Sequence, residues 1–153
     1  MNTETLPMHG TSQPDPVSHP EFYADIPTKR LIAWIVDVLL ITALTFVVTL
    51  LSLFTALFVL PFVFGAIGFL YRWISLSGQS ATPGMRLVSI EFLRPDGDRF
   101  DGGTAFLHTV GYYVSMIVAP LQLVSIALIL LTERRQSLTD IVLGTVAINR
   151  RAA

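Results

Sequence analysis

Two ionisable residues near the start of a long apolar stretch have the types and the spacing for ion or proton chemistry. Arg30 and Asp37 are seven residues apart, which on an α-helix is two turns, about 10 Å of rise and roughly 20° of rotation. Both side chains therefore share one helix face. An ionisable side chain inside an apolar membrane layer costs on the order of 3 kcal/mol, so it indicates a functional site. The alternative is that Asp37 is a structural anchor, bonded to hydroxyl groups or to an arginine of an adjacent segment.

A second acidic residue of interest follows a later apolar stretch. Asp140 lies after Arg134 and Arg135 and shortly before the Gly-Thr-Val sequence at 144–146. This combination of bases, an acid, a glycine turn and a β-prone tail is more than a stop-transfer signal. Taken alone, the same residues are typical of a juxtamembrane basic cluster that meets lipid headgroups.

The distribution of charge indicates the elements that must hold these residues. Of the ten basic and eleven acidic residues, only Asp37 falls within 31–71 and 104–132. The chain is 52% hydrophobic and 14% charged, whereas about 25% charged residues is usual for a soluble domain. A hydrocarbon layer demands such a partition and water does not. We therefore expect an integral membrane protein.

The same composition excludes several classes of protein. There is no basic excess that would hold a nucleic-acid backbone, and the absence of cysteine excludes disulfides and thiolate metal sites. The three histidines have no ligand spacing, and no phosphate loop, nucleophile elbow or dinucleotide fingerprint is found. We therefore expect no enzyme, no cofactor, no metal site, no catalytic residues and no nucleic-acid partner.

The first apolar stretch predicts a transmembrane helical hairpin. As one helix, residues 31–71 would be about 60 Å long at roughly 1.5 Å per residue, which is twice the thickness of the hydrocarbon core of about 30 Å. We place the spans at about 29–50 and 54–76, with Tyr71 as one of the interfacial aromatic anchors. Basic residues flank both open ends of the hairpin, so the positive-inside rule puts both hydrophilic regions and both termini in the cytoplasm.

Two hydrophilic segments flank the hairpin. Residues 1–28 contain four acidic residues, no lysine or arginine and five of the nine prolines, which predicts a disordered, acidic, Pro-rich cytoplasmic tail. Residues 77–103 begin with Gly, Ser and Pro breakers, continue with a strand-like run at 87–92 and then reach a turn sequence at 94–99. We expect a small two-stranded, β-like cytoplasmic loop there.

The third apolar stretch, residues 104–132, has two interpretations. A single helix of about 42 Å would span the membrane but would place the later arginines on the far side. If the stretch breaks near Pro120 and returns, all basic residues stay on one side, and each arm of about 20 Å is too short to span. Such a segment would be re-entrant or interfacial, with its broken backbone buried in protein. Length favours the single span and charge favours the return, which we expect.

Taken in order, these motifs resemble the RDD family of membrane proteins. Three residues are similar to the arginine and the two aspartates that name the family: Arg30, Asp37 and Asp140. Three more are similar to the loop that these proteins carry between their second and third apolar stretches: Gly78, Thr82 and Gly84. The resemblance covers about residues 27–150 and implies an all-α membrane domain, which we place at 29–150.

Two positions depart from the family's pattern. The loop glycine is usually followed by lysine, where this chain has Met85 and then Arg86, and relatives often carry an arginine near the position of His108. No family role is carried over to these positions. We expect His108 to be a hydrogen-bonded histidine at the membrane interface rather than a proton shuttle.

The resemblance implies little about function. Most RDD proteins have no assigned function; some are described as sodium/proton antiporters and others as accessory membrane components. Antiport needs a carboxylate that a proton and a cation occupy alternately. Asp37 is the buried candidate, Asp140 could join it if the third segment folds back, and Arg30 would be the counter-ion.

We therefore expect a small transport protein in the inner (plasma) membrane of a bacterium, with a monovalent cation as its candidate ligand. Three apolar segments hardly enclose a pathway, so transport predicts a homo-oligomer in the lipid bilayer. The alternative is a non-transporting scaffold or assembly partner, in which Arg30, Asp37 and Asp140 form a structural charge cluster.

Overall fold

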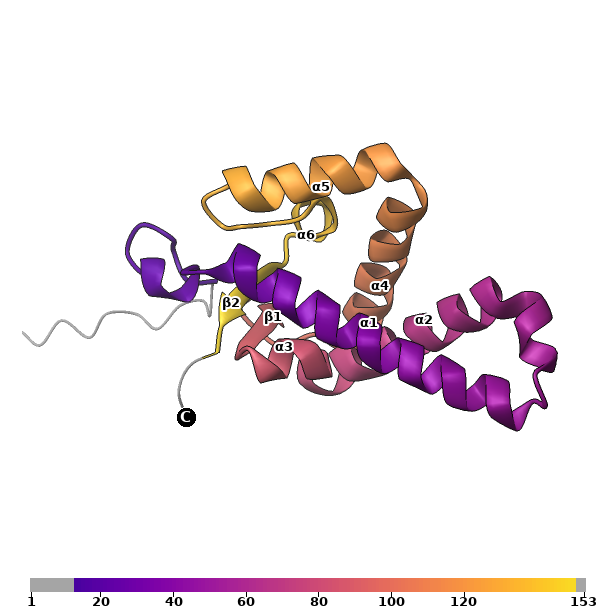
Figure 1. The fold of residues 1–153 in the computed structure, drawn as a ribbon. Helices are drawn as coiled ribbons and strands as arrows, with labels where there is room; N and C mark the ends of the chain where they lie inside the picture. Colours follow the sequence, from indigo (N-terminus) through magenta and orange to yellow (C-terminus); the bar gives the residue numbers. More distant parts are fainter. Residues whose placement is uncertain (1–12, 151–153) are drawn as a thin grey trace, which may run out of the picture.

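The computed structural model describes residues 13–150, and most of them are helical (Figure 1). The elements in chain order are η1 (Pro20–Phe22), α1 (Ile26–Leu51), η2 (Thr55–Val59), α2 (Leu60–Gln79), α3 (Pro83–Leu87), β1 (Ile90–Leu93), α4 (Gly102–Ile117), α5 (Ala119–Leu131), α6 (Leu138–Leu143) and β2 (Val146–Asn149). Helices α1, α2, α4 and α5 carry the apolar stretches. The expected helical membrane fold with a small β element is confirmed.

Helices α1 and α2 form the predicted hairpin, with η2 at its tip (Figure 1). Two segments are long and apolar enough to cross a membrane, Pro20–Leu51 and Thr55–Gln79. The chain reverses at Leu53 and Phe54, which have φ angles of 51° and 65°. Helix α2 begins later than the predicted residue 54, because Pro61 is tolerated in the first turn of an α-helix but breaks its interior.

The third apolar stretch is broken, as predicted, close to Pro120. Helices α4 and α5 meet at Val118 with a bend of 115°. Pro120 has no N–H to donate to the preceding turn, so a continuous helix would lose a hydrogen bond there, whereas the first turn of α5 accepts the ring. Helix α5 consequently runs back toward the beginning of α1 (Figure 1).

The prediction of a β-hairpin within residues 77–103 is wrong. The first breakers belong to the end of α2, and Pro83 and Gly84 begin α3. Strand β1 pairs antiparallel with β2 from the far end of the chain, from Ile90↔Asn149 to Leu93↔Val146. The predicted turn does form, since the Arg94 N–H donates to the Asp98 carbonyl at 2.8 Å. The residues after it continue to α4, where Asp101 is the N-cap. The buried run of β2 supplies the partner strand instead.

The predicted disordered tail is also wrong for residues 13–28; residues 1–12 lie outside the described part of the chain. The Gln13 side-chain amide donates to the carbonyls of Arg94 (3.0 Å) and Gly144 (2.7 Å). The Tyr23 hydroxyl donates to the Pro14 carbonyl, and the ring is buried. The acidic, Pro-rich composition gave no indication of these contacts, which Gln13 makes with the loop at Arg94 and the turn at Gly144.

One buried core lies at the polar-loop end of the hairpin. It joins side chains of α1, α2, α3, β1, α4 and β2: Ile26, Ala33, Leu76, Ala81, Met85, Ile90, Phe92, Phe100, Ala105 and Ala147. Most large apolar side chains beyond this core are exposed, as expected where lipid covers them. The core therefore fixes the relative positions of the polar residues around it.

Candidate functional site

Asp37 lies in α1 and is held by three donors from two other elements. Its Oδ2 accepts a hydrogen bond from Thr82 Oγ1 at 2.5 Å, and its Oδ1 accepts from the Tyr71 hydroxyl at 2.7 Å and the Gly84 N–H at 2.8 Å. The residue is only 5% exposed. Within residues 13–150 it has no basic partner at ion-pair distance, so the prediction that Arg30 is its counter-ion is wrong. Bonding by hydroxyl groups is what the structural alternative predicts.

The start of α3 is shaped to reach Asp37. Thr82 is the N-cap of this helix, and Pro83 occupies its first turn. At Gly84, α3 touches α1 so closely that a Cβ would lie 2.2 Å from the Ala33 carbonyl oxygen and 2.7 Å from Asp37 Oδ1. Glycine therefore allows the backbone N–H to approach the carboxylate where a side chain would prevent it.

Arg30 is paired with Asp140 instead. Arg30 Nη1 lies 2.7 Å from Asp140 Oδ2, and the two side chains are 15% and 0% exposed. The Arg30 guanidinium also lies over the ring of Phe92, with Cζ 5.4 Å from the ring centroid. The return of α5 makes this pairing possible, because it brings α6 against α4 and beside α1.

Asp140 is surrounded by hydrogen-bond donors. Its Oδ1 accepts from His108 Nε2 (2.8 Å) and Thr145 Oγ1 (3.0 Å), and its Oδ2 accepts from the Ser137 N–H (2.9 Å) and hydroxyl (2.7 Å). Ser137 and Asp140 form a capping box at the start of α6. Burial raises the pKa of Asp140, but the Arg30 guanidinium and the bond from His108 outweigh it and hold the pKa well below its usual range. Asp140 is therefore ionised at neutral pH.

His108 is hydrogen-bonded, as predicted, and its partner is Asp140 within the protein interior. His108 is 2% exposed and packs against the rings of Phe92 and Phe100, with centroids 4.4 and 5.4 Å away. Because an ionised Asp140 only accepts hydrogen bonds, His108 Nε2 must carry its hydrogen. His108 Nδ1 has no hydrogen-bond partner in the described part of the chain.

The structure divides the predicted loop residues. Thr82 and Gly84 contact Asp37, whereas Gly78 lies near the end of α2 with nothing within 4 Å of the position of a Cβ. Tyr71, predicted as an interfacial anchor, donates a hydrogen bond to Asp37. It was not identified as a site residue from the sequence. A buried carboxylate requires hydrogen-bond donors, and this requirement could have indicated that a nearby hydroxyl group such as that of Tyr71 binds Asp37. Likewise, the Ser-x-x-Asp spacing of Ser137 could have indicated the capping box.

The order of these residues is that of a known family. The sequence model of the RDD family matches residues 25–144, which is most of the chain and includes Arg30, Asp37 and Asp140. The chain belongs to the RDD family. Neither the curated proteins nor the solved structures that were compared contain a significant match. In this RDD protein the arginine and the two aspartates occupy two sites, because Arg30 binds Asp140 and Asp37 lies apart from them.

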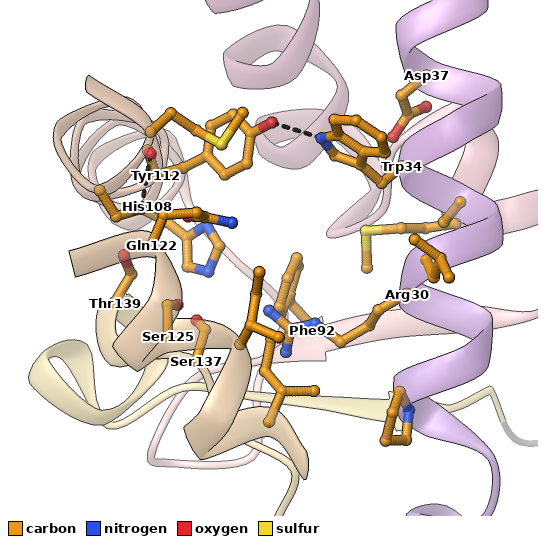
Figure 2. Close-up of a pocket in the computed structure, with 18 of the residues that line it drawn as sticks. Arg30, Trp34, Asp37, Phe92, His108, Tyr112, Gln122, Ser125, Ser137 and Thr139 are labelled. Carbon is orange, nitrogen blue, oxygen red and sulfur yellow. Dashed lines mark hydrogen bonds between the residues drawn. The ribbon is translucent and has the colours of Figure 1, made fainter. Parts of the chain in front are cut away.

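Both sites reach the wall of one cavity. It has a volume of about 590 Å³ and lies between α1 and the α4–α6 region (Figure 2). Arg30, Asp37 and His108 contribute to its wall. Trp34 Nε1 donates to the Tyr112 hydroxyl at 2.9 Å, which links α1 to α4 across it. No cluster of three His, Asp or Glu side chains that could hold a metal ion is present within residues 13–150.

Proposed function

We propose that this RDD protein is a small transporter that exchanges protons for a monovalent cation at Asp37. The supporting observation is the environment of Asp37, a buried carboxylate on a helix long enough to span and on the wall of a cavity. It has no basic partner within residues 13–150. The base that could neutralise it, Arg30, is bound to Asp140. A carboxylate so placed is stabilised by taking up a proton or a cation.

The hydrogen bonds around Asp37 are compatible with both states. The Tyr71 hydroxyl and the Gly84 N–H donate to Oδ1, and Oδ2 faces the Thr82 hydroxyl. That hydroxyl can donate to a carboxylate or accept from a carboxylic acid, so a proton can leave and return without movement of the backbone. The side-chain oxygens of Asp37, Tyr71 and Thr82 are ligands that suit a hard cation such as Na⁺. One proton leaves for each cation bound, so the charge of the site stays constant.

The proposal includes a place and an assembly. We place the protein in a bacterial inner membrane. We orient it with both termini on the cytoplasmic side, because basic residues flank the open end of the hairpin. Two helices and one bent pair hardly enclose a pathway. Transport therefore requires that copies of the chain associate as a homo-oligomer.

A second candidate function is that of a non-transporting scaffold or assembly partner. The supporting observation is the buried cluster of Arg30, His108 and Asp140, which joins α1, α4 and α6. Breaking a buried charge pair is strongly destabilising, so a cluster of this kind suits a structural role. In this case Asp37 also serves as an anchor, and its three hydrogen bonds hold α2 and α3 against α1.

Proton flux distinguishes the two candidates. Wild-type protein, Asp37→Asn and the control Asp96→Asn would be reconstituted at matched abundance in proteoliposomes holding a pH-sensitive dye, and a Na⁺ or K⁺ gradient applied. Asp96 lies in the exposed turn of the loop. Transport predicts cation-dependent flux in the wild type and the control, and a loss of at least tenfold in Asp37→Asn, which cannot exchange a proton.

The outcomes separate function from folding. Absence of flux in folded wild-type protein overturns the transport proposal. Reduced abundance or thermal stability of Asp37→Asn, with normal flux per folded molecule, assigns Asp37 to the scaffold instead.

A further inference from the structure

A further charged group on the cavity wall, Arg72, takes no part in the two sites described above. Arg72 lies in α2, and its guanidinium stacks on the ring of Tyr112, with Cζ 4.1 Å from the ring centroid. Within residues 13–150 Arg72 has no carboxylate at ion-pair distance and no hydrogen-bond partner, and its Nε is buried. Stacking on an aromatic ring offsets only part of the cost of holding an arginine in an apolar span. Its surroundings therefore favour an anion from outside the chain.

Gln122 presents a second donor to the same cavity. Its Oε1 lies 3.2 Å from Ser115 Oγ, and Ser115 also bonds to the carbonyl of Tyr112, whose ring stacks with Arg72. This arrangement assigns the amide oxygen to Ser115. The amide nitrogen points into the cavity and has no partner in the described part of the chain (Figure 2). Arg72 and Gln122 thus both lie next to the Tyr112–Ser115 turn of α4, and both supply unused hydrogen-bond donors.

The rest of the wall identifies the kind of molecule that carries the anion. Four apolar side chains that line the cavity are 40–57% exposed: Leu31, Met116, Ile126 and Leu130. Two of them come from α5, one from α4 and one from α1. In a bilayer these faces are covered by acyl chains. A cavity with these apolar, exposed side chains in its wall suits an anion that carries an acyl chain, which an inorganic anion lacks.

The depth of Arg72 agrees with this. It lies seven residues before the polar end of α2 at Gln79, which is about 10 Å along the helix axis. A bilayer has a hydrocarbon core of about 30 Å within a total thickness of about 40–45 Å. An arginine at this position can therefore reach the lipid phosphates of the leaflet that faces the polar loop.

We propose that the cavity binds one anionic phospholipid, whose phosphate is held by Arg72 and Gln122 and whose acyl chain leaves across the apolar side chains of α1 and α5. The inference does not depend on ion exchange at Asp37. Under this proposal the lipid supplies the missing counter-ion of Arg72. It also fills the space that the return of α5 leaves beside α1.

Lipid titration tests the proposal. Purified wild-type protein in a neutral detergent would be titrated with phosphatidylglycerol or phosphatidylcholine, with bound lipid counted by native mass spectrometry. The variants are Arg72→Gln, Gln122→Leu and the control Arg99→Gln, whose side chain is 62% exposed in the loop. We expect one tightly bound phosphatidylglycerol per chain, an affinity at least tenfold lower in Arg72→Gln, a smaller loss in Gln122→Leu and no change in Arg99→Gln.

Three results would overturn the proposal. One is equal affinity of the wild type for the two lipids. Another is equal loss of phosphatidylglycerol in Arg72→Gln and Arg99→Gln, which would assign binding to general charge attraction. The third is displacement of the lipid by millimolar inorganic phosphate, which would assign the site to a soluble anion. Should Arg72→Gln fail to fold, Arg72→Lys keeps the charge without the flat stacking group, and we expect it to retain the preference for phosphatidylglycerol.

Discussion

The contribution of the buried cluster to stability can be measured by comparing two Asp→Asn substitutions. Asp140 and Asp96 each lie 2.7 Å from an arginine, Arg30 and Arg94 respectively. The chemistry and the distance match, but the burial does not. The Arg30 and Asp140 side chains are 15% and 0% exposed, whereas those of Arg94 and Asp96 are 33% and 45% exposed. The difference between the variants therefore measures the effect of the buried environment of Asp140 as a whole, including its hydrogen bonds from His108, Thr145 and Ser137.

The expected magnitudes follow from this difference. Removing one charge of a buried pair costs about 3–5 kcal/mol, because the remaining charge stays buried without a partner, while an exposed pair contributes about 0–1 kcal/mol. In a soluble domain of about 150 residues, 1 kcal/mol moves the Tm by about 2–4 °C. On this scale Asp140→Asn lowers the Tm by roughly 6–20 °C, and Asp96→Asn lowers it by no more than about 4 °C.

The pH dependence provides a second check. The pKa of Asp140 is held below its usual range in the folded protein, so its contribution to stability is complete above the unfolded-state pKa of about 4. That contribution is lost only as the pH falls through the lower folded-state pKa. The deficit of Asp140→Asn should therefore be the same at about pH 5.5, 7 and 8. Thermal unfolding in one detergent, followed by fluorescence-detected gel filtration, measures it. Shifts for the two variants that agree within about 2 °C would refute the reasoning.

Two further predictions concern the elements around the sites. Gly84→Ala places a Cβ 2.2 Å from the Ala33 carbonyl oxygen, so we expect a loss of about 3 kcal/mol and a lower Tm; Gly78→Ala, which meets nothing within 4 Å, is the control, and equal shifts would contradict the close approach of α3 to α1. Gln13→Ala removes hydrogen bonds to two backbone carbonyls; we expect faster amide hydrogen exchange over residues 14–25 with a Tm change of no more than about 4 °C, and unchanged exchange would show that Gln13 does not hold the segment.

The hairpin and the break of the third segment could be predicted because the bilayer imposes strong constraints on a sequence. A hydrocarbon layer excludes charge, and its thickness limits the length of a span. Residues 31–71 are twice that length and contain one charged residue, so two helices were required. Pro120 and the one-sided distribution of basic residues then indicated the return of α5. Segment length, hydropathy and charge distribution can be read from the sequence without knowledge of individual contacts.

The partner of Arg30 could not be predicted in the same way. Two turns of helix place Arg30 and Asp37 on one face, but a shared face does not put two charges in contact. The competing carboxylate, Asp140, is 110 residues away along the chain, and it reaches Arg30 only after α5 has folded back. The prediction of the partner strand of β1 failed for the same reason. The loop contains a plausible hairpin turn, but the true partner, β2, lies near the C-terminus. Local pattern decides local structure, and these pairings are long-range.

The separation of the two aspartates has a consequence for both candidate functions. Asp140 has a cation, three further side-chain partners and a backbone N–H, so its charge is fixed and neutralised, which is what a structural element requires. Asp37 is bound only by neutral donors, so nothing within residues 13–150 compensates its charge. An exchange site must be open to a proton or a cation in turn, and of these two carboxylates Asp140 is already bound by a cationic side chain. The buried pair of Arg30 and Asp140 supports this indirectly, because it occupies the arginine that shares a helix face with Asp37.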